Sequence, residues 1–174
     1  MRAFSTTLFV LVSLCTVYAS ELSVVGGRSV TGDLKVDSER IDLKDATAFG
    51  ARYEKDFLFI LGFENSFMYG RQLLTPKEGP GEDGLYYSGA LVLNLSSASV
   101  APNLALGLGC LYRFGNSFPK SGFSFLTTFG GGLKLRDLAG PVGLRIDYRR
   151  VTFYGIQGSK VGTNEFTGGA VISF

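Results

Sequence analysis

The sequence contains no histidine and no tryptophan among its 174 residues. Without an imidazole the chain cannot build a Ser-His-Asp or Cys-His nucleophile pair, a histidine metal site or a histidine general base. Charged residues are also scarce, at 18%, and 17 Lys and Arg nearly balance 15 Asp and Glu, for a net charge of +2. This balance gives no electrostatic basis for binding nucleic acid. The absences therefore exclude much familiar enzyme chemistry and leave a small, weakly charged chain.

Cysteine is almost as rare, with two residues in the whole sequence. Cys15 falls in an N-terminal stretch that has an early cation, a short apolar core, and Val17 and Ala19 at the −3 and −1 positions of a cleavage site. We therefore predict a cleaved signal peptide over residues 1–19, too short in its apolar part to span a membrane as a helix. Cys110 would then be the only cysteine left, so no internal disulfide can form.

The mature chain, residues 20–174, has no uninterrupted apolar helix, although its mean hydropathy is positive and it is rich in phenylalanine and glycine. Large apolar residues instead alternate with small or polar ones along most of its length, which is the pattern of amphipathic strands. In the first strand, the adjacent Val24 and Val25 leave the facing open. We expect one all-β domain with strands near residues 22–30, 45–55, 57–69, 84–96, 99–114, 122–136, 141–154 and 164–174.

The predicted connections differ in length. Those after the second, fourth and sixth strands are tight, whereas those after the first, third, fifth and seventh are longer and polar, such as residues 71–83. Short turns at one end and long loops at the other are typical of an outer-membrane barrel, with both termini on the periplasmic side. The sequence therefore predicts an eight-stranded antiparallel up-and-down transmembrane β-barrel.

The two faces of the strands indicate which side meets lipid. Eight strands enclose an interior only wide enough for side chains. The strand face that is crowded with Phe, Leu and Tyr therefore fits better on the outside, in lipid. Inward Leu58, Ile60, Met68 and Leu126 would fill the interior. Arg150 falls on the lipid-facing parity, which counts against a lipid-facing apolar wall unless the residue lies at the rim or a β-bulge turns its side chain. Two aromatic girdles are expected, with Tyr69, Tyr87, Tyr112 and Phe114 near the long loops, and Tyr53, Phe57 and Phe174 near the short turns.

The C-terminal residues 167–174 carry a polar, glycine, apolar and terminal aromatic pattern. This pattern resembles the β-signal of bacterial outer-membrane proteins, and residues 20–174 are similar to small eight-stranded barrels of the OmpX and OmpA-barrel type, the outer-membrane protein β-barrel domain family. The resemblance implies a monomer in the outer membrane of a Gram-negative bacterium, surrounded by lipid and inserted by the barrel-assembly machinery. The assembly-signal residues that it implies are Thr167, Gly169, Ile172 and Phe174.

The inward face carries a few charges that must be paired if they are buried. Strands 57–69 and 141–154 are opposite each other in a ring of eight, so we expect Glu64 to contact Arg145 or Arg149 across the interior. Asp147 would bridge the same arginines along its own strand. Glu165, like Glu64 and Asp147, would neutralise inward arginines. The alternatives are that these three residues supply a carboxylate pair for acid–base catalysis, or that the acidic loop residues bind a divalent cation. These loop residues are Glu78, Glu82 and Asp83.

The function that follows is that of a non-enzymatic barrel with a filled interior, needing no cofactor, and structural or adhesive through its extracellular loops. One alternative is passage of small or hydrophobic solutes through the barrel. The other is an outer-membrane lipid-modifying enzyme, which the missing histidine disfavours because the known families of that kind use one in their active sites.

Overall fold

The computed structural model describes residues 20–36, 39–58, 60–77, 81–96, 98–115 and 122–174. The predicted signal peptide therefore lies outside the described residues. In the described part of the chain, no helix is long and apolar enough to cross a membrane. The strands found there are β1 (Ser20–Thr31), β2 (Leu34–Val36), β3 (Glu39–Ile41), β4 (Ala46–Asp56), β5 (Leu61–Arg71), β6 (Glu82–Asn94), β7 (Val100–Gly115), β8 (Gly122–Ala139), β9 (Val142–Ile156) and β10 (Ser159–Ser173).

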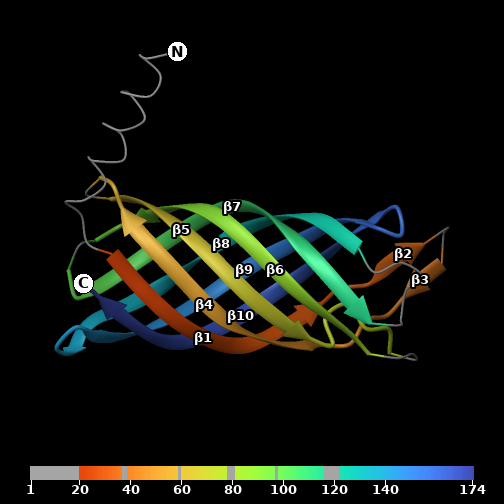
Figure 1. The fold of residues 1–174 in the computed structure, drawn as a ribbon, viewed down its shortest axis with the longest axis horizontal. Coiled ribbons are helices and arrows are strands. Elements are labelled where there is room, and N and C mark those ends of the chain that lie inside the picture. Colours follow the sequence, from red (N-terminus) through yellow and green to blue (C-terminus); the bar gives the residue numbers. More distant parts are fainter. Residues whose placement is uncertain (1–19, 37–38, 59, 78–80, 97, 116–121) are drawn as a thin grey trace, which may run out of the picture.

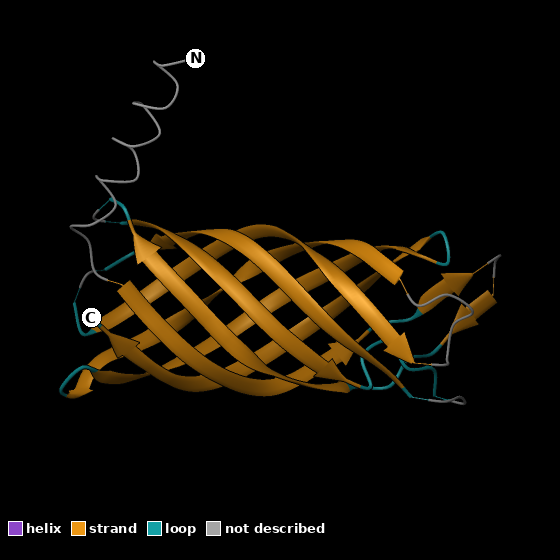
Figure 2. Cartoon of the chain, viewed as in Figure 1, coloured by secondary structure: helices purple, strands orange, loops and turns teal. Residues whose placement is uncertain are grey.

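Eight of these strands form a closed antiparallel barrel in the order β1-β10-β9-β8-β7-β6-β5-β4, while β2 and β3 form a separate hairpin. The barrel closes where β1 pairs with β10, in a continuous register from Glu21 opposite Ser173 to Thr31 opposite Thr163. The start of β1 and the end of β10 lie together at one end of the barrel, which we call the turn end. The β2–β3 hairpin lies at the opposite end, which we call the loop end (Figures 1 and 2). The predicted eight-stranded barrel is confirmed.

The predicted third strand begins too early. Phe57, Leu58 and Ile60 lie in the connection between β4 and β5, where the Phe57 and Leu58 N–H groups both donate to the Leu61 carbonyl. Leu58 and Ile60 are therefore half exposed, at 50% and 52%, and do not fill the interior as predicted. Met68 and Leu126 do lie inside, at 1% and 0% exposure.

The last connection is also shorter than predicted. β9 runs on to Ile156, which pairs with Ser159, so only Gln157 and Gly158 lie between β9 and β10. Both have positive φ, 50° and 75°, as in the two-residue type I′ turn that matches the twist of a hairpin. Of the other predicted long connections, those between β1 and β4 and between β5 and β6 lie at the loop end, and residues 116–121, between β7 and β8, are outside the described residues.

Burial alternates along each strand, as the pleat requires. The alternation settles the facing of β1, because Val25 is 2% exposed and Val24 is 67% exposed. The outward positions carry large apolar side chains around the whole barrel, whereas most inward ones carry small, polar and charged groups, with large apolar ones toward the loop end. So much exposed apolar surface is unfavourable in water and suits the hydrocarbon of a bilayer, where a closed barrel satisfies every backbone hydrogen bond.

Candidate functional site: the filled lumen and its cap

Six charged side chains meet in the middle of the lumen, and we call them the central charge cluster. Each is at most 2% exposed. They come from β4, β5, β9 and β10, and β5 and β9 are four strands apart in the ring, so their inward side chains face each other across the lumen. The members are Arg52, Glu64, Arg145, Asp147, Arg149 and Glu165.

Glu64 is held by two arginines from the opposite wall. Arg145 Nη2 lies 3.0 Å from Glu64 Oε2, and Arg149 Nη1 lies 2.6 Å from Glu64 Oε1. Asp147 accepts from Arg145 Nε at 2.8 Å, two residues away on the same strand. The structure thus brings together all four residues that the sequence placed in an interior cluster.

Arg52 and Glu165 complete the cluster. Arg52 was not predicted to belong to it, whereas Glu165 was expected to neutralise an inward arginine but without a named partner. Arg52 Nη1 donates to Asp147 at 2.7 Å and Arg52 Nη2 to Glu165 at 2.8 Å, and the Tyr86 hydroxyl also donates to Glu165. With them the cluster holds three guanidinium and three carboxylate groups and is formally neutral. Arg52 lies on the same face of its strand as Ala48 and Gly50, and the small size of those residues was the sequence signal that this face points inward.

Glycine on β8 makes room for these long side chains. A Cβ at Gly130 would lie 2.1 Å from the Tyr148 carbonyl oxygen and 3.0 Å from Arg149 Cγ. One at Gly132 would lie 2.5 Å from the Ile146 carbonyl oxygen and 2.6 Å from Asp147 Oδ1. The glycines therefore sit where the arginine and aspartate side chains of β9 pass along the wall.

A second ionic group, the basal charge cluster, lies toward the turn end and was missed by sequence reasoning. Lys134 Nζ donates to Glu21 and to Glu54, each at 2.7 Å, and Arg136 also pairs with Glu21. The Asn94 amide donates to Glu54 at 2.9 Å. Lys134 is fully buried, so its ammonium is stable there only because carboxylates surround it.

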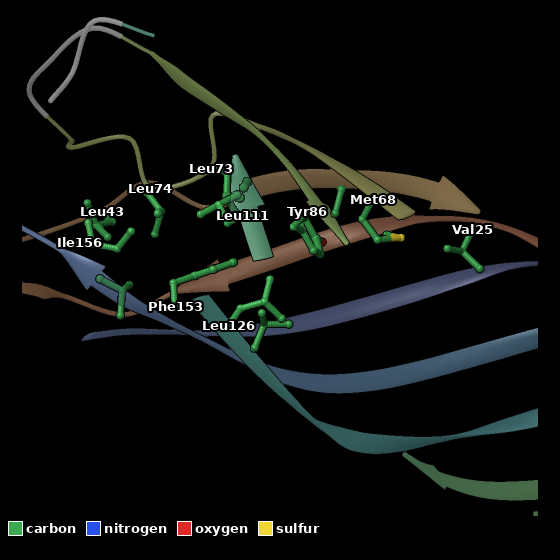
Figure 3. Close-up of a cluster of buried hydrophobic side chains, with 14 residues drawn as sticks. Val25, Leu43, Met68, Leu73, Leu74, Tyr86, Leu111, Leu126, Phe153 and Ile156 are labelled. Atoms are coloured by element: carbon green, nitrogen blue, oxygen red, sulfur yellow. The ribbon is translucent and has the colours of Figure 1, made fainter. Parts of the chain in front are cut away.

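Toward the loop end the lumen becomes apolar. Met68, Leu111, Leu126 and Phe153 project inward from four strands and pack with Tyr86 (Figure 3). The Tyr86 and Phe153 rings meet edge to face, with centroids 6.1 Å apart. This apolar layer separates the central charge cluster from the loops.

The loops supply the top of that layer. We call residues 42–45, before β4, together with residues 72–77, after β5, the cap. Leu43, Leu73 and Leu74 of the cap are 5%, 1% and 0% exposed and belong to the same apolar cluster (Figure 3). Burial of each leucine contributes roughly 1.5–3 kcal/mol. The cap therefore closes the loop end of the lumen, although the sequence read residues 71–83 as a polar surface loop.

Backbone hydrogen bonds join the two halves of the cap. Lys44 N–H donates to the Thr75 carbonyl at 2.8 Å, and Lys77 N–H donates to the Asp42 carbonyl at 2.9 Å. The Lys77 and Asp42 side chains also pair at 3.0 Å, and this hydrogen bond and the lysine charge lower the pKa of Asp42 below its ordinary value. The side-chain pair thus persists until the pH falls through that lowered pKa.

The acidic loop residues are occupied by partners within the protein. The Asp83 carboxylate accepts from the Gln72 N–H at 2.8 Å and from the Tyr69 hydroxyl at 2.5 Å, and Glu82 pairs with Arg113 at 3.2 Å. Glu78 lies outside the described residues. Among the residues that are described, no group of three Cys, Asp or Glu is arranged to hold a metal ion.

Three residues of the implied assembly signal lie on the two faces of β10, and the fourth, Phe174, directly follows the strand. Thr167 is buried and Gly169 packs against the Val24 and Val25 backbone, whereas Ile172 and Phe174 are 45% and 69% exposed on the outside. The Phe174 N–H and carbonyl both hydrogen-bond to Ser20, each at 2.9 Å.

Aromatic rings form a chain on the outer wall near the loop end. Phe49 and Tyr69 have centroids 5.0 Å apart, Tyr69 and Phe114 are 6.1 Å apart, and the chain continues through Tyr112 to Phe123. Three of the four aromatic residues predicted for this girdle belong to the chain. The fourth, Tyr87, lies nearer the turn end, and its hydroxyl donates to the Asn65 side-chain oxygen.

Three solved structures of outer-membrane barrels are similar to this one, although no family model and no curated protein sequence matches the chain. Neisserial surface protein A is 12% identical with a TM-score of 0.63, covering 90% of this chain and 97% of its own. Ail, the attachment invasion locus protein of Yersinia pestis, is 24% identical with a TM-score of 0.51, covering 88% and 99%. The outer membrane enzyme PagL is 14% identical with a TM-score of 0.55, covering 88% and 98%. The chain therefore has the fold of the small eight-stranded outer-membrane β-barrels.

Proposed function

We propose that this protein is a closed, non-conducting barrel of the outer membrane that acts through its loop end, as a structural or adhesive protein. The observation that carries the proposal is the filled lumen. Two charge clusters and an apolar layer follow one another along it, and Leu73 and Leu74 of the cap are fully buried against that layer. Such a lumen leaves the loop surface as the part that meets other molecules.

The same observation argues against passage of solutes. The buried charges are paired with one another, so a permeating ion would have to displace ion pairs such as those between Glu64 and Arg149. The chain also has no histidine, which removes the imidazole base from any enzymatic alternative. PagL shows that this fold also hosts an enzyme, so the proposal rests on this chain's own residues and not on the fold.

Planar-bilayer recording tests closure. We expect the refolded protein, inserted at a level verified by gel, to give no stable conductance steps. Reproducible steps of one size from the pure protein would contradict the proposal and favour the solute-passage alternative.

Cell adhesion tests the role of the loop end. Cells that carry the protein on their surface are compared with cells that carry a variant whose residues 75–77 are replaced by glycine and serine, leaving Leu73 and Leu74 in place. We expect the variant to reach the same surface level and to adhere less to epithelial monolayers. Equal adhesion by wild type, variant and cells without the protein would refute the adhesive role.

A further inference from the structure

A notch of about 830 Å³ lies on the outer wall of β9 and β10 near the loop end. It faces outward and is separate from the lumen, because most of its strand residues are on the outward parity, namely Arg150, Thr152, Tyr154, Lys160 and Gly162. Three side chains supply its chemistry, namely Arg150, Tyr154 and Lys160. The other lining residues are Gly32, Asp33, Thr152, Gly155, Gly158, Ser159 and Gly162.

Arg150 is the outward arginine that conflicts with a purely apolar exterior. Its guanidinium donates to the Asn164 side-chain oxygen at 2.8 Å and lies over Gly162, where a Cβ would be 2.2 Å from its Nη2. Glycine at position 162 therefore lets the guanidinium lie flat against β10. No carboxylate of the described residues is within ion-pair distance of it.

Lys160 adds a second cation to the notch. It stands opposite Tyr154 in the β9–β10 register and, like Arg150, makes no ion pair with a described carboxylate. Asp33 also lines the notch, but its carboxylate pairs with Arg40 at 3.5 Å. By contrast, the outward Arg28 on neighbouring β1 has its own partner, Asp45, at 3.1 Å. Neither cation of the notch thus forms an ion pair with a carboxylate of the chain's described part.

The notch begins where the apolar band of this wall ends. One step along the outward face from the Arg150–Asn164 pair toward the turn end, the rings of Tyr148 and Phe166 pack with centroids 4.9 Å apart. On β8, Phe129 is 61% exposed directly opposite Arg150. A molecule whose anionic head contacts Arg150 would therefore place apolar chains on these rings.

We propose that this notch binds a phosphate in the headgroup of a membrane lipid of the outer leaflet. A guanidinium binds phosphate through two parallel N–H···O bonds, a lysine adds a point charge, and a tyrosine fits the interface with its hydroxyl in the polar layer. A soluble phosphate would use the same cations but none of the adjacent apolar surface. The site goes beyond the closed-barrel function, because it concerns the wall of the barrel and neither the lumen nor the cap.

Native mass spectrometry of the refolded protein in detergent micelles tests the proposal. The probes are diphosphoryl lipid A, the same lipid with both phosphates removed, and inorganic phosphate. A cation near a membrane surface contributes roughly a fivefold gain in affinity for an anionic lipid. We therefore expect the double variant Arg150→Gln, Lys160→Gln to bind diphosphoryl lipid A about 30-fold more weakly than wild type.

Two further variants keep the test specific. Lys55→Gln removes an outward cation at the turn end and should leave binding unchanged, and Arg150→Lys keeps the charge and should retain part of the affinity. Equal binding of phosphorylated and dephosphorylated lipid, or equal loss in Lys55→Gln, would overturn the proposal. Inorganic phosphate binding as tightly as the lipid would overturn the assignment to a lipid. Unboiled gel mobility verifies that each variant is folded.

Discussion

At the scale of single residues, the lumen shows how charge is stabilised where water is excluded. Glu64 is fully buried, yet each carboxylate oxygen contacts a guanidinium, and the six members of the central charge cluster balance to zero. A buried ion pair contributes little net stability compared with an apolar pair, but removing one partner leaves the other charge uncompensated. Each buried charge of the cluster is therefore stable only while its partners are present.

Glu64→Ala is predicted to destabilise the barrel by roughly 3–5 kcal/mol, as expected for breaking a buried pair. The substitution leaves three arginines facing two carboxylates in the central charge cluster. Urea unfolding of the refolded protein in lipid vesicles measures the change. Ser66→Ala, two residues further along the same inward face, is the matched control and should cost less than about 1 kcal/mol. A Glu64→Ala loss no larger than the control's would contradict the prediction.

At the scale of elements, alternation in the sequence predicted the strands well, because one face of every strand meets lipid and the other meets the lumen. It failed where the chain turns. Leu58 and Ile60 continue the alternation of β5 but belong to a turn, and the alternation of β10 starts at Ser159, before the predicted boundary. Alternation reports which face a residue is on and carries no information on where the chain reverses.

The candidate site was less predictable than the strands. Glu64, Arg145, Asp147 and Arg149 followed from parity and from the opposition of two strands. The basal charge cluster depends on the heights at which β1, β4 and β8 are staggered, which parity does not fix. The inward fold of the cap depends on contacts between two loops far apart in the sequence. Its one local signal was the pair Leu73-Leu74 inside an otherwise polar loop.

The cap is held by Asp83, and we predict that Asp83→Ala frees it. The carboxylate accepts the Gln72 N–H, and Gln72 and Leu74 both have strained positive φ values, 58° and 60°. Positive φ costs about 1–3 kcal/mol at such residues, so the loop stays in place only while its contacts persist. Trypsin should cut the variant faster after Arg71 or Lys77. The control Asp137→Asn, near the end of β8 at the opposite end of the barrel, should match wild type, and equal cleavage in both variants would contradict this role.

The last strand carries a separate prediction about biogenesis. Phe174→Ala keeps the two backbone bonds to Ser20 and removes only an exposed ring, so refolding in detergent should be unchanged. Deletion of Phe174 removes those bonds as well. If the assembly machinery recognises the Phe174 side chain, both variants should be depleted from the outer membrane of cells. Immunoblots of membrane fractions quantify the depletion. Normal levels of Phe174→Ala would refute the assembly role.

At the scale of the whole molecule, the outer wall is not uniform around the barrel. The aromatic chain from Phe49 to Phe123 follows β4 to β8, whereas Arg150 and Lys160 lie on β9 and β10. The proposed function and the proposed lipid site rest on two properties, a filled lumen and this differentiated exterior. Both properties require that the ring be closed, since an open edge would expose backbone groups to lipid.

Closure is testable at the seam between β1 and β10. Val24 and Ala170 are register partners on the outer face, within reach of a disulfide. We predict that Val24→Cys, Ala170→Cys, in a Cys110→Ser background, forms an intramolecular disulfide when the folded protein is oxidised. The bond joins residues near opposite ends of the chain, so the boiled, non-reduced protein should migrate as a compact ring and return to full-length mobility on reduction. Val24→Cys, Ile172→Cys shifts one partner by two residues and should cross-link far less. Equal cross-linking of both pairs, or none of the first, would contradict a barrel closed in this register.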